Sequence, residues 1–197
     1  GRMFETFASS DDSLSAWESQ TRDYLDGEEL VDSPPVHILN VNSNNTGNMD
    51  DYQKVRFGIT TTLLGDGYFG FDYGTENHAQ LWEYDEYEAF IGKPLGTFQN
   101  ALNPQQSSID QGVWSREFSE GKVLVNASQI TQTIRLDGDF EKIHGIQDPT
   151  INNGRIVSEI TLASQDGIIL LRPIANIQNA VFQNGALASI HDAKGSI

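Results

Sequence analysis

The sequence contains no cysteine, which excludes disulfides, thiolate metal sites and a cysteine nucleophile. Basic residues are also scarce, because 12 Lys and Arg stand against 28 Asp and Glu and give a formal net charge of -16. An acidic surface repels the phosphate backbone that dominates nucleic-acid affinity, so we expect no nucleic-acid partner. No window approaches the roughly 18 consecutive apolar residues of a membrane span, so we expect no membrane insertion.

The composition otherwise suits a folded protein. Of 197 residues 38% are hydrophobic, including ten Phe, six Tyr and three Trp, which is enough for a sizeable core. An acidic, glycine-rich chain without cysteine favours a secreted or cell-surface bacterial protein. The sequence opens on an apolar stretch at Gly1 without an initiator Met, so we expect it to belong to a longer parent chain.

The first half alternates between strand-like and helix-like segments. Residues 36–41 and 68–73 are short apolar runs typical of buried strands, and residues 3–4 form a third such run. Residues 11–25 and 50–64 have apolar side chains at helical spacing. The order strand, helix, strand, helix, strand predicts parallel βαβ units over residues 1–112.

The second half consists of short strand-like runs separated by turn signals such as Asp137-Gly138-Asp139. Residues 113–173 are therefore expected to form an antiparallel, sandwich-like β-domain. Residues 174–197 are expected to be a linker or the start of a further module.

Two carboxylates follow predicted strands and are candidates for catalysis. In the strand over residues 68–73, Asp72 alternates with the aromatic side chains and lies near the carboxyl end, where barrel enzymes place their chemistry. Glu5 follows the strand at residues 3–4 in the same way. If the three strands are neighbours, Glu5 and Asp72 lie about 10 Å apart at the backbone. Side chains that lean inward could reach the roughly 5 to 9.5 Å between the paired carboxylates of glycosidases, so the geometry permits a sugar-cleaving pair. Asp72 could instead cap a turn, and Glu5 could be a surface carboxylate.

Polar and aromatic residues nearby are candidates for substrate binding. Asn40 and Asn42 end the intervening strand and could bind sugar hydroxyls, although both residue types also form turns. The segment Trp82-Glu83-Tyr84-Asp85-Glu86-Tyr87-Glu88 mixes aromatic faces with carboxylates, as a sugar subsite does. It could equally be an amphipathic cover whose aromatic residues pack inward. The candidates for binding are Asn40, Asn42, Tyr68, Trp82, Tyr84 and Asp85.

No metal or cofactor is expected. The four histidines, His37, His78, His144 and His191, have no ligand spacing, and no glycine-rich phosphate fingerprint opens a helix.

Residues 55–72 (VRFGITTTLLGDGYFGFD) resemble a late helix and strand of the TIM-barrel glycoside hydrolases grouped as hypothetical glycosyl hydrolase family 15. Segments at residues 82–96, 112–126 and 166–171 are similar to that family in order and spacing. The resemblance implies an α/β region followed by an all-β region, namely the last part of a (β/α)8 TIM barrel and a C-terminal β-domain. It also implies activity on a polysaccharide, but supplies no catalytic pair.

We therefore interpret the chain as part of a glycoside hydrolase that acts on an extracellular polysaccharide by carboxylate acid/base chemistry. A non-catalytic structural or adhesive protein is the first alternative. A carbohydrate-binding module that uses Trp82 and Trp114 as stacking platforms is the second.

Overall fold

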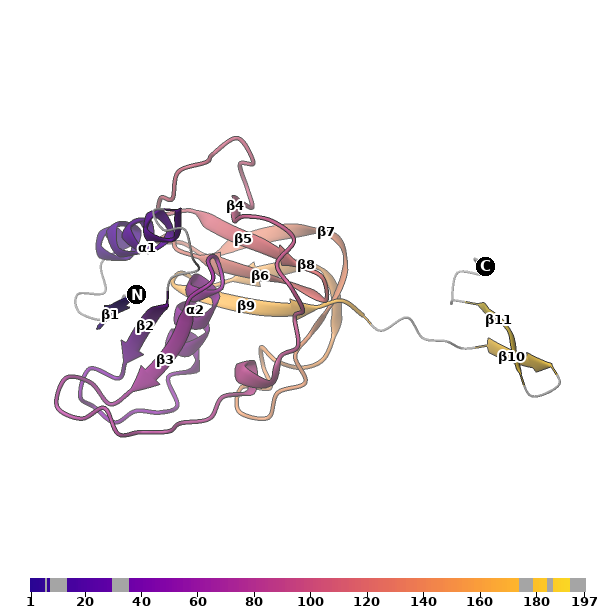
Figure 1. Ribbon diagram of the computed structural model, residues 1–197, viewed down its shortest axis with the longest axis horizontal. Coiled ribbons are helices and arrows are strands. Elements are labelled where there is room, and N and C mark those ends of the chain that lie inside the picture. The colour runs from indigo at the N-terminus through magenta and orange to yellow at the C-terminus, as the bar shows by residue number, and fades with distance from the viewer. Residues whose placement is uncertain (6, 8–13, 30–35, 174–178, 184–185, 192–197) are drawn as a thin grey trace.

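The computed structural model describes residues 1–5, 7, 14–29, 36–173, 179–183 and 186–191. Three sheets and two α-helices make up this part of the chain (Figure 1). In chain order the elements are β1 (Arg2–Phe4), α1 (Leu14–Glu29), β2 (His37–Asn42), α2 (Tyr52–Thr62), β3 (Tyr68–Asp72), the 3-10 helix η1 (Asp85–Glu88), β4 (Gln99–Asn100), β5 (Val113–Phe118), β6 (Gly121–Asn126), β7 (Gln132–Lys142), β8 (Ile156–Leu162), β9 (Asp166–Leu171), β10 (Asn179–Gln183) and β11 (Ala186–His191).

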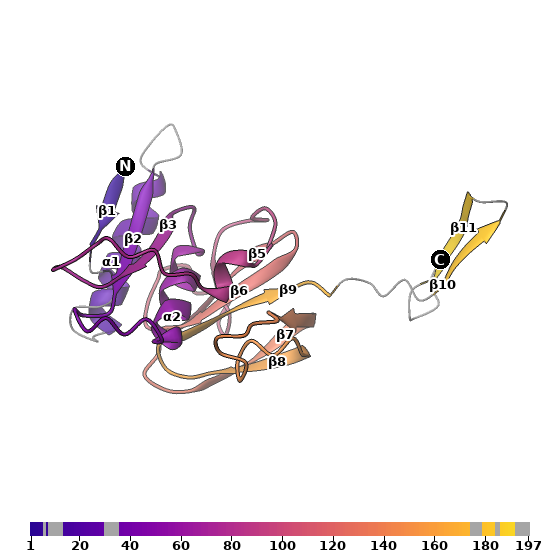
Figure 2. The ribbon, with the colours of Figure 1, turned by 90° about the horizontal axis from the view of Figure 1, so that it is seen from below.

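The first three strands form a parallel sheet in the order β1-β2-β3. The expected parallel pairing of residues 36–41 with 68–73, joined by a helix over residues 50–64, is confirmed. Asp51 caps the N-terminus of α2, because its side chain accepts a hydrogen bond from the backbone N–H of Lys54. Both helices cover the same face of this sheet (Figure 2).

The fold class expected for the whole chain is wrong. After β3 the described chain has no further α-helix, and short connections fold strands β4 to β9 into a six-stranded antiparallel sheet in the order β4-β5-β6-β9-β7-β8. The protein is thus mostly β, without the helix pattern of a TIM barrel. The domain boundaries expected at residues 112 and 173 stay predictions.

The sandwich-like arrangement is wrong as well. Strand β7 pairs with both β8 and β9, so the six strands share one sheet that curls into half of a barrel (Figure 2). The turn expected at Asp137-Gly138-Asp139 lies inside β7, which continues to Lys142 with a register shift between Arg135 and Phe140. A bulge bends a strand without ending it, which a search for turn residues alone does not detect.

Helix α2 lies between the two larger sheets. It packs against β2 and β3 on one side and against β6 and β9 on the other, and every residue from Val55 to Thr62 is buried. A Cβ atom on Gly58 would lie 2.6 Å from the Phe69 ring, and one on Gly167 would lie 2.9 Å from the Arg56 carbonyl oxygen. Two glycines therefore permit the close approach of α2 to both sheets.

Gly167→Ala is expected to lower the free energy of unfolding by roughly 1 to 3 kcal/mol, because its methyl group would overlap Thr60 Oγ1 on α2. Urea unfolding would measure the change. Gly138→Ala in β7 is the control, since no atom lies within 4 Å of its Cβ position and its change should be within about 0.5 kcal/mol. Equal effects of the two substitutions would contradict the close contact.

Four large apolar side chains of α1, α2 and β3 belong to the core. Trp17, Phe57, Ile59 and Phe71 are at most 8% exposed, whereas Leu63 is half-buried. Residues 179–183 and 186–191 pair as an antiparallel hairpin in the region expected to be a linker, and the other residues of 174–197 lie outside the described part. Neither described α-helix is long and apolar enough to cross a membrane.

Candidate functional site

The face of the parallel sheet that points away from the helices carries the candidate site. Successive side chains of a strand point to opposite faces of the sheet. Those of Phe4, Leu39 and Phe71 point toward the helices and belong to the apolar core. The opposite face presents Met3 and Tyr68, which are 51% and 63% exposed. Parallel sheets are ordinarily covered on both faces, so a solvent-exposed face on this parallel sheet is unusual.

Asp72 ends β3 on this open face. Its side chain is buried, and its Oδ2 atom accepts a hydrogen bond of 3.0 Å from Nδ2 of Asn40 on β2. The same oxygen lies 2.6 Å from Nδ1 of His78. The other oxygen, Oδ1, is buried and has no hydrogen-bond partner among the described residues. Asp72, Asn40 and His78 therefore form a cluster around one carboxylate oxygen.

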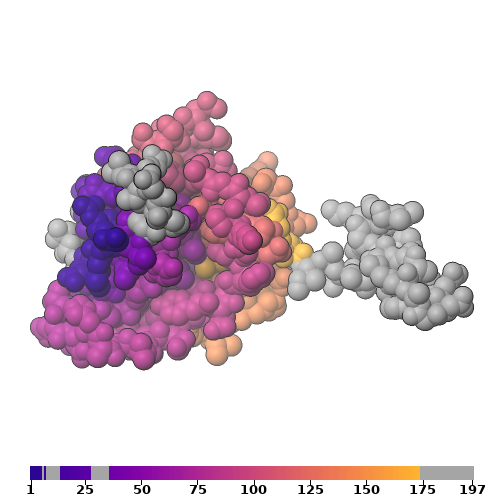
Figure 3. All heavy atoms as spheres, in the orientation of Figure 1, coloured from indigo at the N-terminus to yellow at the C-terminus, as the bar shows by residue number. Residues whose placement is uncertain are grey.

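The loops that follow β2 and β3 hold this cluster in place. Backbone N–H groups of Ser43 and Asn45 donate to the carbonyl oxygens of Asp72 and Tyr73. Gly74 has a φ of 140°, a value that favours glycine, and turns the chain back toward the sheet. The loop after β3 lies along the lower side of the molecule, where β2 and β3 end (Figure 3). This turn is what brings His78 back to Asp72.

Two carboxylates act on the His78 imidazole. Its hydrogen bond with Asp72 raises the pKa of His78, partial burial opposes this, and the charges of Asp72 and Glu5 raise the pKa further. The side chain of His78 is 50% exposed, so it lies at the boundary between the sheet and solvent. Glu5 is thus close enough to His78 to influence its charge.

The strand register gives the separation of the two candidate carboxylates. Phe4 pairs with Leu39 and Asp72 pairs with Asn42. Glu5 therefore lies two strand spacings and two residues from Asp72, or about 12 Å between backbone positions. A mechanism that uses both carboxylates requires both side chains to extend toward each other over the open face.

The asparagines predicted to bind substrate have different surroundings. Asn40 is part of the Asp72 cluster. Asn42 is buried, and its Oδ1 accepts a hydrogen bond of 2.9 Å from the backbone N–H of Asn44. Asn44 and Asn45 both have positive φ, which Asn tolerates in turns. The geometry of Asn42 is that of a turn former.

The aromatic segment packs mainly as a cover. Trp82 is half-buried against Phe71, with ring centroids 5.5 Å apart, and the Tyr84 hydroxyl donates to the Met49 carbonyl oxygen over 2.9 Å. Burial raises the pKa of Tyr84 above its ordinary value of 10.0. Asp85 accepts hydrogen bonds from two backbone N–H groups in the loop at residues 146–147 and so fastens two loops together.

The remaining candidates lie elsewhere. Tyr68 begins β3 and Asp72 ends it, so the two are about 13 Å apart along the strand. Trp114 is fully buried, which removes it as a stacking platform. Of the predicted site residues, Asn40 and Asp72 therefore lie together, and Glu5 acts on the same cluster through its charge. Tyr68, Tyr84 and Asp85 lie apart from this cluster.

Sequence reasoning missed His78 as a member of the site. Nothing in its spacing from Asp72 marks it, because its position depends on the path of the loop through Gly74. Within the described ranges, no group of three or more His, Asp or Glu side chains could hold a metal ion.

Comparison with known proteins gives one finding. The model of a family described as "Hypothetical glycosyl hydrolase family 15" matches residues 1–122. This range covers β1 through the start of β6 and includes all members of the Asp72 cluster. No curated protein matches the chain.

Proposed function

Because the chain belongs to the hypothetical glycosyl hydrolase family 15, we propose that it cleaves glycosidic bonds at the Asp72 cluster. Asp72 and Glu5 supply the two carboxylates that this reaction ordinarily uses. The observation that carries the proposal is the buried Asp72 carboxylate, which has two N–H groups directed at one oxygen and none from the described residues at the other.

The surroundings of Asp72 favour a functional role over a turn cap. A capping carboxylate accepts hydrogen bonds from nearby backbone N–H groups. Asp72 instead meets two side chains, Asn40 from a neighbouring strand and His78 from a loop. A buried oxygen without a hydrogen bond costs about 1 to 3 kcal/mol, and such costs collect at sites that serve a function.

The protonation state of His78 depends on pH, so this residue can hold a proton at the site. The imidazole forms a hydrogen bond with Asp72 and lies within the electrostatic influence of Glu5, and both effects favour its protonated form. We assign His78 the role of a positioning residue that fixes the Asp72 carboxylate and holds a proton beside it. It lies on the accessible side of the cluster, where a sugar hydroxyl could meet its ring.

The pKa of His78 is expected to lie above the ordinary value of 6.5, and Asp72→Asn should return it toward that value. Titration of the ring-proton NMR signals of His78 in the wild-type and Asp72→Asn proteins would measure both values. Because folding raises this pKa, the stabilisation from protonated His78 is present below pH 6.5 and is lost as pH rises through the folded pKa. An unchanged His78 signal in Asp72→Asn would contradict the contact.

The proposed activity is tested by the release of new reducing ends from a panel of polysaccharides. Hydrolysis of at least one polymer is expected.

We propose a carbohydrate polymer as the partner and a secreted or cell-surface location, as the acidic composition favours. Binding of a polymer without hydrolysis would point to the non-catalytic structural or carbohydrate-binding alternative, which the exposed Met3 and Tyr68 on the open sheet face favour.

A further inference from the structure

A second concave site lies at the other end of β3. It is a pocket of about 410 Å³ between α2, β3, η1 and β9. Ile59 comes from α2, Leu63 from the C-cap of that helix, Phe69 from β3 and Ile169 from β9, and all four contribute apolar surface. We call it the β3 pocket. Its size is that of sites for small molecules.

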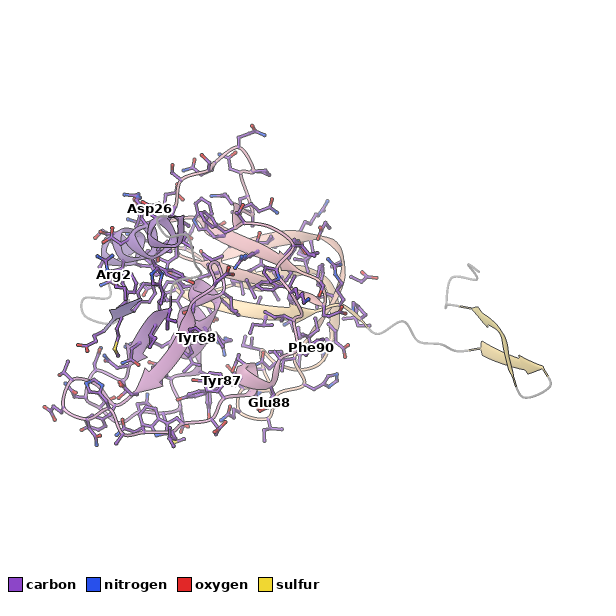
Figure 4. The ribbon with its side chains drawn as sticks, in the orientation of Figure 1. Arg2, Asp26, Tyr68, Tyr87, Glu88 and Phe90 are labelled. Atoms are coloured by element: carbon purple, nitrogen blue, oxygen red, sulfur yellow. The ribbon has the colours of Figure 1, made fainter. Side chains whose placement is uncertain are left out.

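Two partly exposed tyrosines line the β3 pocket. Tyr68 is 63% exposed and Tyr87 is 39% exposed, and both are labelled in Figure 4. Tyr87 packs edge-on against Phe69, with ring centroids 6.2 Å apart. Burial raises the pKa of Tyr87 to about 12. Both side chains add aromatic surface to the lining of the pocket.

One carboxyl group lines the β3 pocket. Glu86 on η1 is 6% exposed, and its Oε1 accepts a hydrogen bond of 2.8 Å from Nδ2 of Asn152. Burial raises the pKa of Glu86, whereas the hydrogen bonds from Asn152 and from its own backbone N–H and the charge of Arg56 lower it. A carboxyl group is an acceptor in either protonation state, so it can receive one further donor.

We propose that the β3 pocket binds a small, uncharged aromatic ring compound that donates a hydrogen bond to Glu86. The apolar walls match the faces of such a ring, and the lining tyrosines can pack against its edge. A sugar fits less well, because its many hydroxyl groups would lose water against apolar walls with few polar partners. The site is also distinct from the Asp72 cluster, since the length of β3 separates them.

The test uses 6-fluoroindole, whose fluorine signal reports binding by NMR. We expect a dissociation constant of about 0.1 to 1 mM, as small ring compounds reach in apolar pockets. N-methyl-6-fluoroindole, which lacks the N–H donor, should bind roughly fivefold more weakly. 2-Deoxy-2-fluoroglucose at the same concentration should show no binding.

Variants locate the bound compound. Leu63→Trp and Ala89→Leu both add volume to the lining and should each weaken 6-fluoroindole binding at least tenfold. Phe90→Ala is the matched control, because Phe90 is 77% exposed beside the pocket and does not line it, so affinity should stay within twofold. Thermal unfolding identifies which variants are folded.

Three results would overturn the proposal. The first is unchanged 6-fluoroindole binding in both volume-adding variants, which would place the compound elsewhere. The second is tighter binding of the fluorosugar than of the indole, which would make the pocket a sugar subsite. The third is no binding of 6-fluoroindole by the folded wild-type protein at millimolar concentration. None of these depends on hydrolysis, so failure here and failure of the proposed glycosidase activity are separable.

Discussion

Asp72→Asn is expected to lower the turnover of a cleaved polysaccharide by about 10²- to 10⁴-fold, the range that a positioned acid or base contributes. The amide can still accept the hydrogen bond from Asn40, so the cluster keeps its packing while it loses the carboxylate. Thermal unfolding should therefore change little. Initial rates of reducing-end release, measured with wild-type and variant protein at equal concentration, give the ratio.

Asp66→Asn is the matched control for this experiment. Asp66 is also an aspartate close to a strand of the parallel sheet, but it lies before β3, beside Arg116, with 63% of its side chain exposed. Its substitution should leave turnover within twofold. Full activity in Asp72→Asn would assign Asp72 to the turn after β3, and the structural or binding alternative would then be favoured.

The largest effect on stability is expected for Arg56→Met. Arg56 on α2 is 3% exposed and donates two hydrogen bonds, of 2.9 and 3.1 Å, to the carboxylate of Asp166 on β9. It donates a third, of 2.6 Å, to Asp148. Burial lowers the pKa of Arg56, but the hydrogen bonds and charges of Asp166 and Asp148 have a larger effect, so the pKa of Arg56 is raised.

Removal of this guanidinium leaves Asp166 as a buried carboxylate without its partner. The free energy of unfolding should fall by about 3 to 5 kcal/mol, as it does when one member of a buried ion pair is removed. Arg135→Met is the control, because Arg135 is 91% exposed and lies 3.9 Å from Glu159, and its loss should be below about 1 kcal/mol. A similarly small loss in Arg56→Met, measured by urea unfolding, would contradict a structural role for this network.

The parallel sheet could be predicted from the sequence because each of its parts has a local signature. Residues 36–41 and 68–73 are short apolar runs, and the helix between them has an acidic start at Asp50 and Asp51 and ends before Gly65. The central position of α2 also has a signal in the sequence. Apart from Arg56, residues Val55 to Thr62 have apolar or Thr side chains around the whole helix, and a helix of this kind is buried on all sides.

The antiparallel part was predicted as strands, but their arrangement was not. The second half was expected to consist of short strands, yet nothing local reveals that β7 pairs with β9 and curls the sheet. Pairings between segments far apart in the sequence depend on the whole chain. The turn residues inside β7 increased the error, because a Gly between two Asp suggests a chain reversal.

Most of the candidate site could be predicted. Asp72 and Asn40 were found because the ends of neighbouring parallel strands meet at one edge. His78 could not be found, because its loop returns to the sheet through backbone geometry that no residue pattern specifies. Tyr68 was grouped with Asp72 from their common strand, although the length of that strand separates them.

The position of α2 between two sheets has a consequence for how the protein folds as it is synthesised. The residues of the parallel sheet and of α2 have all been synthesised once β3 has been made. The face of α2 that carries Arg56 and Thr60 can be covered only after β9 has been synthesised. β9 follows roughly a hundred residues later, which at ~5 to 20 residues per second is about 5 to 20 s of translation. During this interval the nascent chain exposes a helix face meant for burial, which is a surface that chaperones recognise.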